Sequence, residues 1–289
     1  MKWEDGRRSD NVEDRRGMGG GGRGLPIGKM AGGGLGVIVI AVIVMLMGGD
    51  PSGLLGGLTE SGSVGSQTQE RPRSPGEDRA AAFVSTVLAN TEDVWNQQMP
   101  RLGKNYVEPK LQLFTDVAQS ACGSQSAAVG PFYCPGDSKV YLDLSFFEQL
   151  ERELGAPGDF AQAYVIAHEI GHHIQNLIGV SRMVQDQQSR VDEVAGNDLS
   201  VRLELQADFF AGVWAHYAHA QGQLESGDFE EAFRAASKIG DDVLQKRARG
   251  YATPDSFTHG TAEQRARWFR KGFDTGDPTL GDTFNARQL

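Results

Sequence analysis

Three residues near the middle of the chain, His168, Glu169 and His172, have types and spacing suited to metal chemistry. Two histidines four positions apart on a helix project from one face about one turn apart, so both imidazoles can reach one metal ion. Glu169 is displaced around the helix from His168, where its carboxylate can accept a proton from a water activated by the metal. The pattern therefore predicts a zinc site with a general base beside it.

A catalytic zinc normally has three protein ligands and one open position, so a third ligand is needed. The candidates are Glu204, Asp208, His216, His219 and His259. Glu204 and Asp208 lie one turn apart in an apolar helix, which does not bury two like charges without compensation, and a dication supplies it. We expect Glu204 to bind the metal and Asp208 to accept the outer N–H of His168, with the reverse assignment as the alternative. His216 and His219 are two to three turns further on, so we expect them to be packing or surface residues.

Two other histidines need a separate assignment. His173 is about 100° around the helix from His172, so we expect it not to bind the metal. The reaction also needs a donor for the developing oxyanion. His259, in a turn rich in Ser, Thr and Gly, is the first candidate for this catalytic role, and Tyr141 or Tyr133 follows. A turn or helix-capping histidine is the alternative for His259.

The motifs HEIGHH and ELQADFF, with the later DSFTHGT at 255–261 and the Cys134-Pro segment, resemble the bacterial putative neutral zinc metallopeptidase family. This membrane-associated family is similar to the gluzincins, in which a Glu-x-x-x-Asp helix follows the HExxH helix. The resemblance implies a zincin-like domain with one zinc ion per chain. It implies His168, His172 and Glu204 as zinc ligands, Glu169 as the base and Asp208 as the partner of a ligand histidine. The likeness is expected over roughly residues 75–285.

The hydrophobic periodicity predicts a mostly helical α+β domain with a small sheet ahead of the metal-binding helix. The expected strands are 110–114 and 139–144, and the expected helices are 80–97, 145–154, 158–178, 199–221, 227–246 and 261–272. In gluzincin-like domains an edge strand before the metal-binding helix pairs with the substrate, so 139–144 could bind an extended peptide. The alternative is that this strand only supports the helix.

The first quarter of the chain has a different composition. Residues 1–30 contain a glycine run and few large apolar residues, so we expect a disordered tail. Residues 31–49 carry no charge and predict one transmembrane helix, with a cleaved signal peptide as the alternative. Residues 50–76 have the composition of a flexible linker, which leaves 77–289 for the metallopeptidase domain.

The charge distribution predicts where the domain lies. The basic residues Arg15, Arg16, Arg23 and Lys29 precede the apolar segment, which favours a single-pass protein of the cell membrane with a cytoplasmic N-terminus and an extracytoplasmic domain. Two cysteines, Cys122 and Cys134, enclose a short loop, and in an exported domain this favours a disulfide, with free thiols as the alternative.

The net formal charge of −10 would repel nucleic acid, so we expect no nucleic-acid partner. Together these features predict hydrolysis of peptide bonds in a peptide or protein substrate by a membrane-anchored zinc metalloendopeptidase. The ligand set favours zinc, although cobalt or manganese would also fit. The alternative function is a catalytically silent zinc-binding factor that assembles or binds partners in the cell envelope. The retention of a base, Glu169, beside three ligands disfavours that alternative, because a structural zinc site is closed by four ligands.

Overall fold

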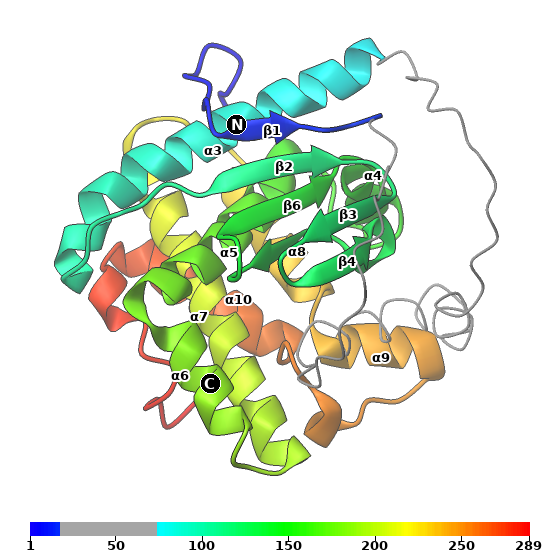
Figure 1. Ribbon diagram of the computed structural model, residues 1–289, viewed down its shortest axis with the longest axis vertical. Helices are drawn as coiled ribbons and strands as arrows, with labels where there is room; N and C mark the ends of the chain where they lie inside the picture. Colours follow the sequence, from blue (N-terminus) through cyan, green and yellow to red (C-terminus); the bar gives the residue numbers. More distant parts are fainter. Residues whose placement is uncertain (18–73) are drawn as a thin grey trace.

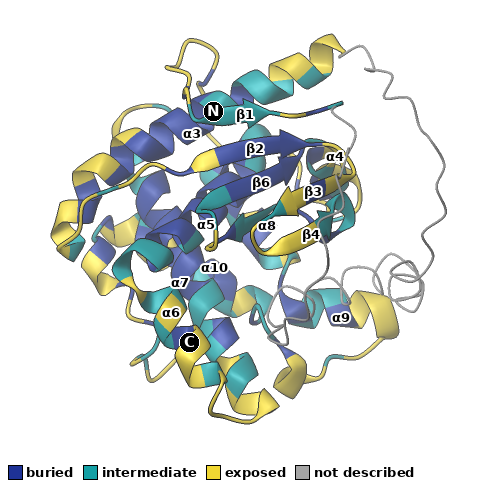
Figure 2. Ribbon diagram, viewed as in Figure 1, coloured by how far each residue is buried: buried dark blue, intermediate teal, exposed yellow. Residues whose placement is uncertain are grey.

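A four-stranded mixed sheet lies against a group of helices in the computed structural model, which describes residues 1–17 and 74–289 (Figure 1). The strand order is β1-β2-β6-β5, where β1, β2 and β6 are parallel and β5 is antiparallel to β6. The strands are β1 (Val12–Asp14), β2 (Lys110–Phe114), β5 (Phe132–Cys134) and β6 (Lys139–Asp143). Strands β2 and β6 correspond to the two expected strands, of which only 139–144 shows alternation, and Figure 2 shows that both are largely buried.

The position of β6 corrects one prediction. This strand, expected to be an edge that pairs with substrate, is hydrogen-bonded to β2 on one side and to β5 on the other. Its backbone groups are therefore already used within the sheet. The strand at the edge nearest the metal-binding helix is β5 instead.

Helices make up most of the rest of the described chain, as predicted. They are α3 (Pro75–Gln98), α4 (Ser145–Arg152), α5 (Asp159–Ile178), α6 (Val180–Gln188), α7 (Glu193–Ala220), α8 (Asp228–Lys238), α9 (Asp241–Arg249) and α10 (Ala262–Thr275). The expected helix 227–246 is two helices, because the chain passes so close to α10 at Gly240 that a Cβ there would lie 2.1 Å from the Ala262 nitrogen. A capping box of Thr261 and Gln264 starts α10.

The core is formed mainly where α5, α7 and α10 pack together beneath the sheet (Figures 1 and 2). Trp95, Trp214 and Trp268 are buried in this core. A separate hairpin, β3 (Val117–Ser120) with β4 (Gly123–Ser126), covers the other face of the sheet, and the predicted disulfide between Cys122 and Cys134 joins this hairpin to β5. The domain thus places the helix that carries the HExxH motif at its centre.

Residues 1–17 are part of this fold, so the prediction of a disordered tail is wrong for them. Strand β1 extends the sheet by pairing with β2, and Trp3 packs edge-on against Phe83 with ring centroids 5.3 Å apart. Arg7, Ser9 and Asn11 all bind the buried carboxylate of Glu92 in α3. The prediction was wrong because it considered only the small number of apolar residues. Polar side chains that share one buried partner, Glu92, hold much of this segment against α3.

The expected transmembrane segment at 31–49 lies outside the described residues, as do the remainder of the tail at 18–30 and residues 50–73 of the linker. Among residues 1–17 and 74–289 no helix is both long and apolar enough to cross a bilayer. Residues 1–17 and 74–289 share one core, and Arg16 binds the first turn of α3 through the carbonyl of Glu77.

Candidate metal centre

Helix α5 carries His168, Glu169 and His172 through the middle of the domain. Nearly every residue of the helix from Phe160 to Gln175 is buried, which explains its apolar composition. The two imidazoles lie one turn apart with ring centroids 4.8 Å from each other and their planes close to perpendicular. Both rings face α7, the helix that supplies the acidic residues.

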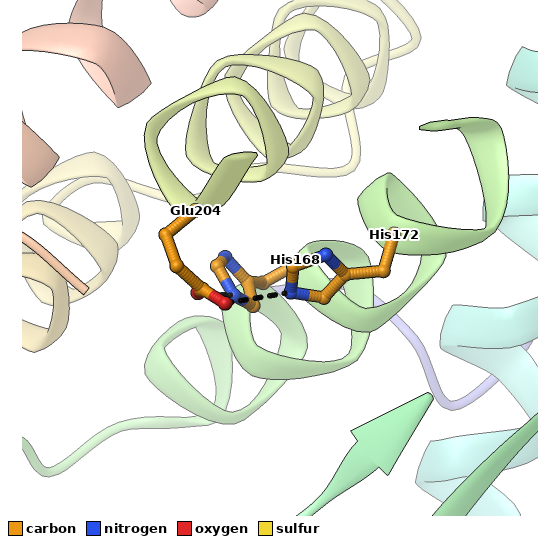
Figure 3. Close-up of side chains that lie close together, drawn as sticks. All are labelled: His168, His172 and Glu204. Atoms are coloured by element: carbon orange, nitrogen blue, oxygen red, sulfur yellow. Dashed lines mark hydrogen bonds and ion pairs between the residues drawn. The ribbon is translucent and has the colours of Figure 1, made fainter. Parts of the chain in front are cut away.

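Glu204 of α7 reaches both histidines (Figure 3). Its carboxylate oxygens lie 3.1 Å from Nε2 of His168 and 3.5 Å from Nε2 of His172. This approach depends on Gly171, because a Cβ at that position would lie 2.8 Å from the carbonyl oxygen of Ala207 in α7. The glycine inside the motif therefore lets the two helices come close enough for one carboxylate and two imidazoles to converge.

The geometry fits a tetrahedral cation. Ligand atoms of His168, His172 and Glu204 all lie within 4.8 Å of one another. Two ligands that are each about 2.0–2.1 Å from zinc at a tetrahedral angle are separated by about 3.3 Å. The separations of 3.1 and 3.5 Å lie on either side of that value. Two imidazole nitrogens and one carboxylate are also the donor set that zinc prefers.

His168 is held from behind by Asp208. The Nδ1–H of His168 donates to Asp208 Oδ1 at 2.8 Å, which leaves Nε2 free to face Glu204. Tyr164 donates to the same oxygen at 2.5 Å, and Arg265 of α10 donates to both oxygens at 2.8 and 3.0 Å. Burial would raise the pKa of this carboxyl group, but Arg265 and His168 outweigh it and lower the pKa to about 2. Asp208 is therefore ionised at neutral pH, and its carboxylate orients the ring of His168.

His172 is held by Gln175, a residue that sequence reasoning missed. Oε1 of Gln175 accepts the Nδ1–H of His172 at 2.9 Å, so Nε2 of His172 faces Glu204, as Nε2 of His168 does. The amide nitrogen of Gln175 donates to the carbonyl of Leu203 at 2.6 Å and to Gln206 at 3.2 Å. Gln175 thus connects one ligand histidine to the backbone next to Glu204. Its position three residues after His172 was the only signal in the sequence.

The protonation states of His168 and Glu169 depend on their burial and on the neighbouring charges. Burial lowers the pKa of His168, but Asp208 and Glu204 outweigh it and raise the pKa to about 10. A cation held by the same side chains would have to displace this proton, so metal affinity should weaken as the pH falls. Burial raises the pKa of Glu169, although His172 and His168 oppose the shift. Glu169 is buried and accepts no hydrogen bond from another described residue, which leaves its carboxylate available as a base.

His259 lies in the loop before α10, half-buried, and its Nδ1 is 3.2 Å from Asp241 Oδ1. Burial lowers its pKa, but the hydrogen bond to Asp241 and the charge of Glu204 outweigh burial and raise it. His259 and Glu204 are therefore near enough for each charge to shift the pKa of the other. The other two candidates for the oxyanion donor are engaged elsewhere, since Tyr141 donates to Asp137 and Tyr133 binds His173.

The remaining histidines have structural partners. His173 is buried against Tyr133 and the carbonyl of Val107, and burial lowers its pKa to about 4, so it is neutral. His216 donates from Nδ1 to the carbonyl of Phe273 at 2.7 Å. The ring of His219 lies against Phe273 with centroids 5.8 Å apart. None of these three histidines belongs to the group of His168, His172 and Glu204 that could hold a metal ion, as expected.

The match to known sequences covers both the site and the N-terminal segment. A family model described as "Putative neutral zinc metallopeptidase" matches residues 1–284. The chain belongs to this metallopeptidase family. The family match is wider than the expected 75–285 and includes residues 1–17, which agrees with their place in the fold.

Proteins that resemble this chain occur in Escherichia coli and in mycobacteria. Uncharacterized protein YpfJ of Escherichia coli strain K12 is 49% identical over 290 residues, which cover 98% of this chain and 99% of that protein. Uncharacterized proteins Mb2605 of Mycobacterium bovis and Rv2575 of Mycobacterium tuberculosis strain H37Rv are each 41% identical over 211 residues, or 69% of both chains. No solved structure matches this chain.

Proposed function

We propose that the protein is a zinc-dependent endopeptidase in which His168, His172 and Glu204 hold the ion. The observation that carries the proposal is the convergence of two Nε2 atoms and one carboxylate beside a buried glutamate that is not among the ligands. A site that served only to hold the fold together would be closed by a fourth ligand and would not need Glu169. The family membership of the chain supports the same reaction class.

Bound zinc would supply a Lewis acid that makes a water more acidic and polarises a carbonyl group. Glu169 takes a proton on its carboxylate from the attacking water and then gives it to the nitrogen of the leaving amine. His259 donates a hydrogen bond to the substrate oxygen as negative charge develops there. Asp241 keeps His259 oriented and protonated for that task. Asp208 and Gln175 hold the two histidine ligands in the tautomers that the site requires.

The substrate would be a peptide bound in extended form. Strand β5 supports this because it is paired only on the β6 side among the described strands and lies against α5. An extended peptide can add to such an edge through main-chain hydrogen bonds. We therefore assign to Phe132–Cys134 the pairing with substrate that was expected of residues 139–144.

We also propose that the domain works outside the cytoplasm, which the disulfide of Cys122 and Cys134 supports. Attachment to a membrane through residues 31–49 is part of the same proposal. The shared core supports a position of residues 1–17 on the same side of that membrane as residues 74–289. The orientation expected from the basic residues, with the two ends on opposite sides, requires β1 to leave the sheet.

The test uses the full chain, because residues 1–17 belong to the fold. Zinc content and hydrolysis of casein are measured for the wild type, Glu169→Gln and Glu204→Gln, with the exposed Glu193→Gln of α7 as the control. We expect one zinc per chain in the wild type, retained zinc without activity in Glu169→Gln, and weaker zinc binding in Glu204→Gln. Zinc binding without hydrolysis by the wild type would favour the silent envelope factor. Absence of zinc from folded wild-type protein would refute both functions.

A further inference from the structure

Strand β5 is three residues long and pairs with β6 through Phe132, Tyr133 and Cys134. So short a strand makes few backbone hydrogen bonds to its neighbour. The contacts of its side chains therefore contribute to its position. Alternate side chains of a strand point to opposite faces of the sheet. Cys134 packs with Phe114 and Tyr141 on the face covered by the hairpin, so Tyr133 points to the other face, toward α5.

Tyr133 enters a chain of hydrogen bonds that ends on α5. Asn176 donates from Nδ2 to the Tyr133 oxygen at 3.0 Å, and the Tyr133 hydroxyl lies 3.0 Å from Nδ1 of His173. On the far side of the ring, Nε2 of His173 lies 2.6 Å from the carbonyl of Val107. A carbonyl only accepts, so Nε2 carries the proton of the neutral ring. Nδ1 is then an acceptor, and the Tyr133 hydroxyl donates to it.

This chain of bonds is attached directly to the candidate metal ligands. His173 follows His172 in sequence, and Asn176 lies one turn beyond His172 on the same helix. The rings of Tyr133 and His173 also touch, with centroids 5.4 Å apart. Helix α5 is largely buried at this point, so the Tyr133 hydroxyl connects β5 to the part of the core that carries His172.

We propose that Tyr133 and His173 are positioning residues that align β5 with the metal centre and thereby place an extended peptide for cleavage. The inference rests on the proposed peptidase function and names the part of the chain that aligns its substrate. A peptide that pairs with β5 binds through main-chain hydrogen bonds to that strand, so a displaced β5 binds the peptide less tightly. His173, the third histidine of the HEIGHH motif, thus serves the substrate strand and not the metal.

The test compares Tyr133→Phe with the wild type in the full chain. Loss of the hydroxyl frees β5 from His173 and Asn176 but leaves the ring in place. Tyr217→Phe is the matched control, because it removes another hydroxyl that donates one hydrogen bond, to the carbonyl of Gly276. The substrates are oxidised insulin B chain, which is long enough to pair with β5, and a blocked dipeptide amide, which is too short. Zinc affinity is measured on the same proteins.

We expect Tyr133→Phe to raise KM for the insulin B chain by about tenfold, with kcat, zinc affinity and dipeptide cleavage close to those of the wild type. Three results would overturn the inference. Unchanged KM would show that β5 needs no such alignment. Equal losses on both substrates together with weaker zinc binding would show that Tyr133 only supports the metal-binding helix. A lower kcat at unchanged KM would make Tyr133 a donor to the reacting oxygen.

A binding measurement separates this inference from the proposed function. Fluorescent insulin B chain is titrated into zinc-loaded Glu169→Gln with and without Tyr133→Phe. If the wild type does not cleave the peptide but Glu169→Gln binds it, the proposed peptidase function is refuted. The two binding affinities, with and without Tyr133→Phe, still test the alignment of β5. Weaker binding in the double variant supports the alignment, and equal binding overturns it. If no peptide binds, both ideas fail.

Discussion

Asp241 holds His259 from two directions. Its Oδ1 lies 3.2 Å from the ring nitrogen Nδ1, and its Oδ2 accepts the backbone N–H groups of Thr258 and His259 itself, both at 2.7 Å. The carboxylate therefore orients the imidazole and its loop together. It also lies at the first residue of α9, so the break between α8 and α9 is what places it there.

The first prediction concerns the pH profile of this pair. Asp241 raises the pKa of His259, so the ring stays protonated to a higher pH than an isolated histidine. If His259 donates to the substrate oxygen, activity falls as pH rises through this pKa. Asp241→Asn removes the charge and should move the alkaline limb of kcat/KM to lower pH, whereas His259→Ala should lower kcat about 10²–10³-fold. An unmoved alkaline limb in Asp241→Asn would mean that another group titrates there.

The second prediction concerns Arg265, whose guanidinium binds both oxygens of the fully buried Asp208. Arg265→Met leaves that charge without its main partner, which typically costs about 3–5 kcal/mol of unfolding free energy. Chemical denaturation would measure the loss. Arg267→Ala on the same helix removes an exposed ion pair with Glu263 and should cost less than about 1 kcal/mol. Similar losses in the two variants would show that Asp208 does not depend on Arg265.

The third prediction concerns Gln175, which joins His172 to the backbone of α7. Gln175→Ala frees the His172 ring to rotate and loosens the spacing of the two helices. Zinc affinity should fall about 10–100-fold, as it does when partners of metal ligands are removed elsewhere. Competition with a chelator measures this without any assay of activity. Gln187→Ala, on the exposed side of α6, should bind zinc as the wild type does.

The site was largely predictable because its chemistry follows a local period. His168 and His172 share a face through helical spacing, as do Glu204 and Asp208, and the structure brings the two pairs together. Gln175 and Arg265 could not be assigned, since the bonds from Gln175 to Leu203 and from Arg265 to Asp208 depend on how closely α5, α7 and α10 approach. The packing of α7 against Gly171 has no signature beyond the glycine itself.

The sheet was less predictable, because strand order is a long-range property. Alternation located β2 and β6 but could not show that β5 lies outside β6. Residues 1–17 were missed for the same reason. Val12 pairs with Leu111, about a hundred residues away, and the polar groups of the segment find their partner in Glu92 only once α3 is in place.

The fourth prediction concerns Glu92, a buried carboxylate that accepts from Arg7, Ser9 and Asn11. Glu92→Ala leaves these donors without their shared acceptor and should lower the unfolding free energy by about 1–3 kcal/mol. Asp93→Ala is the control, because its carboxylate is exposed and binds only Arg7 among the described residues. Thermal unfolding of the full chain compares the two. Equal stability of both variants would mean that residues 1–17 are not docked in solution.

The last prediction concerns the side of the membrane on which the N-terminal segment lies. Residues 1–17 share a core with the rest of the domain, so both should face the same compartment. Asp10→Cys and Lys104→Cys place single thiols at exposed positions of the two parts, and the two natural cysteines do not compete because they form a disulfide. A thiol reagent that does not cross membranes should label both variants in spheroplasts or neither. Labelling of Lys104→Cys alone would show that β1 leaves the sheet when the chain is in the membrane and that the chain crosses once, with its N-terminus inside the cell.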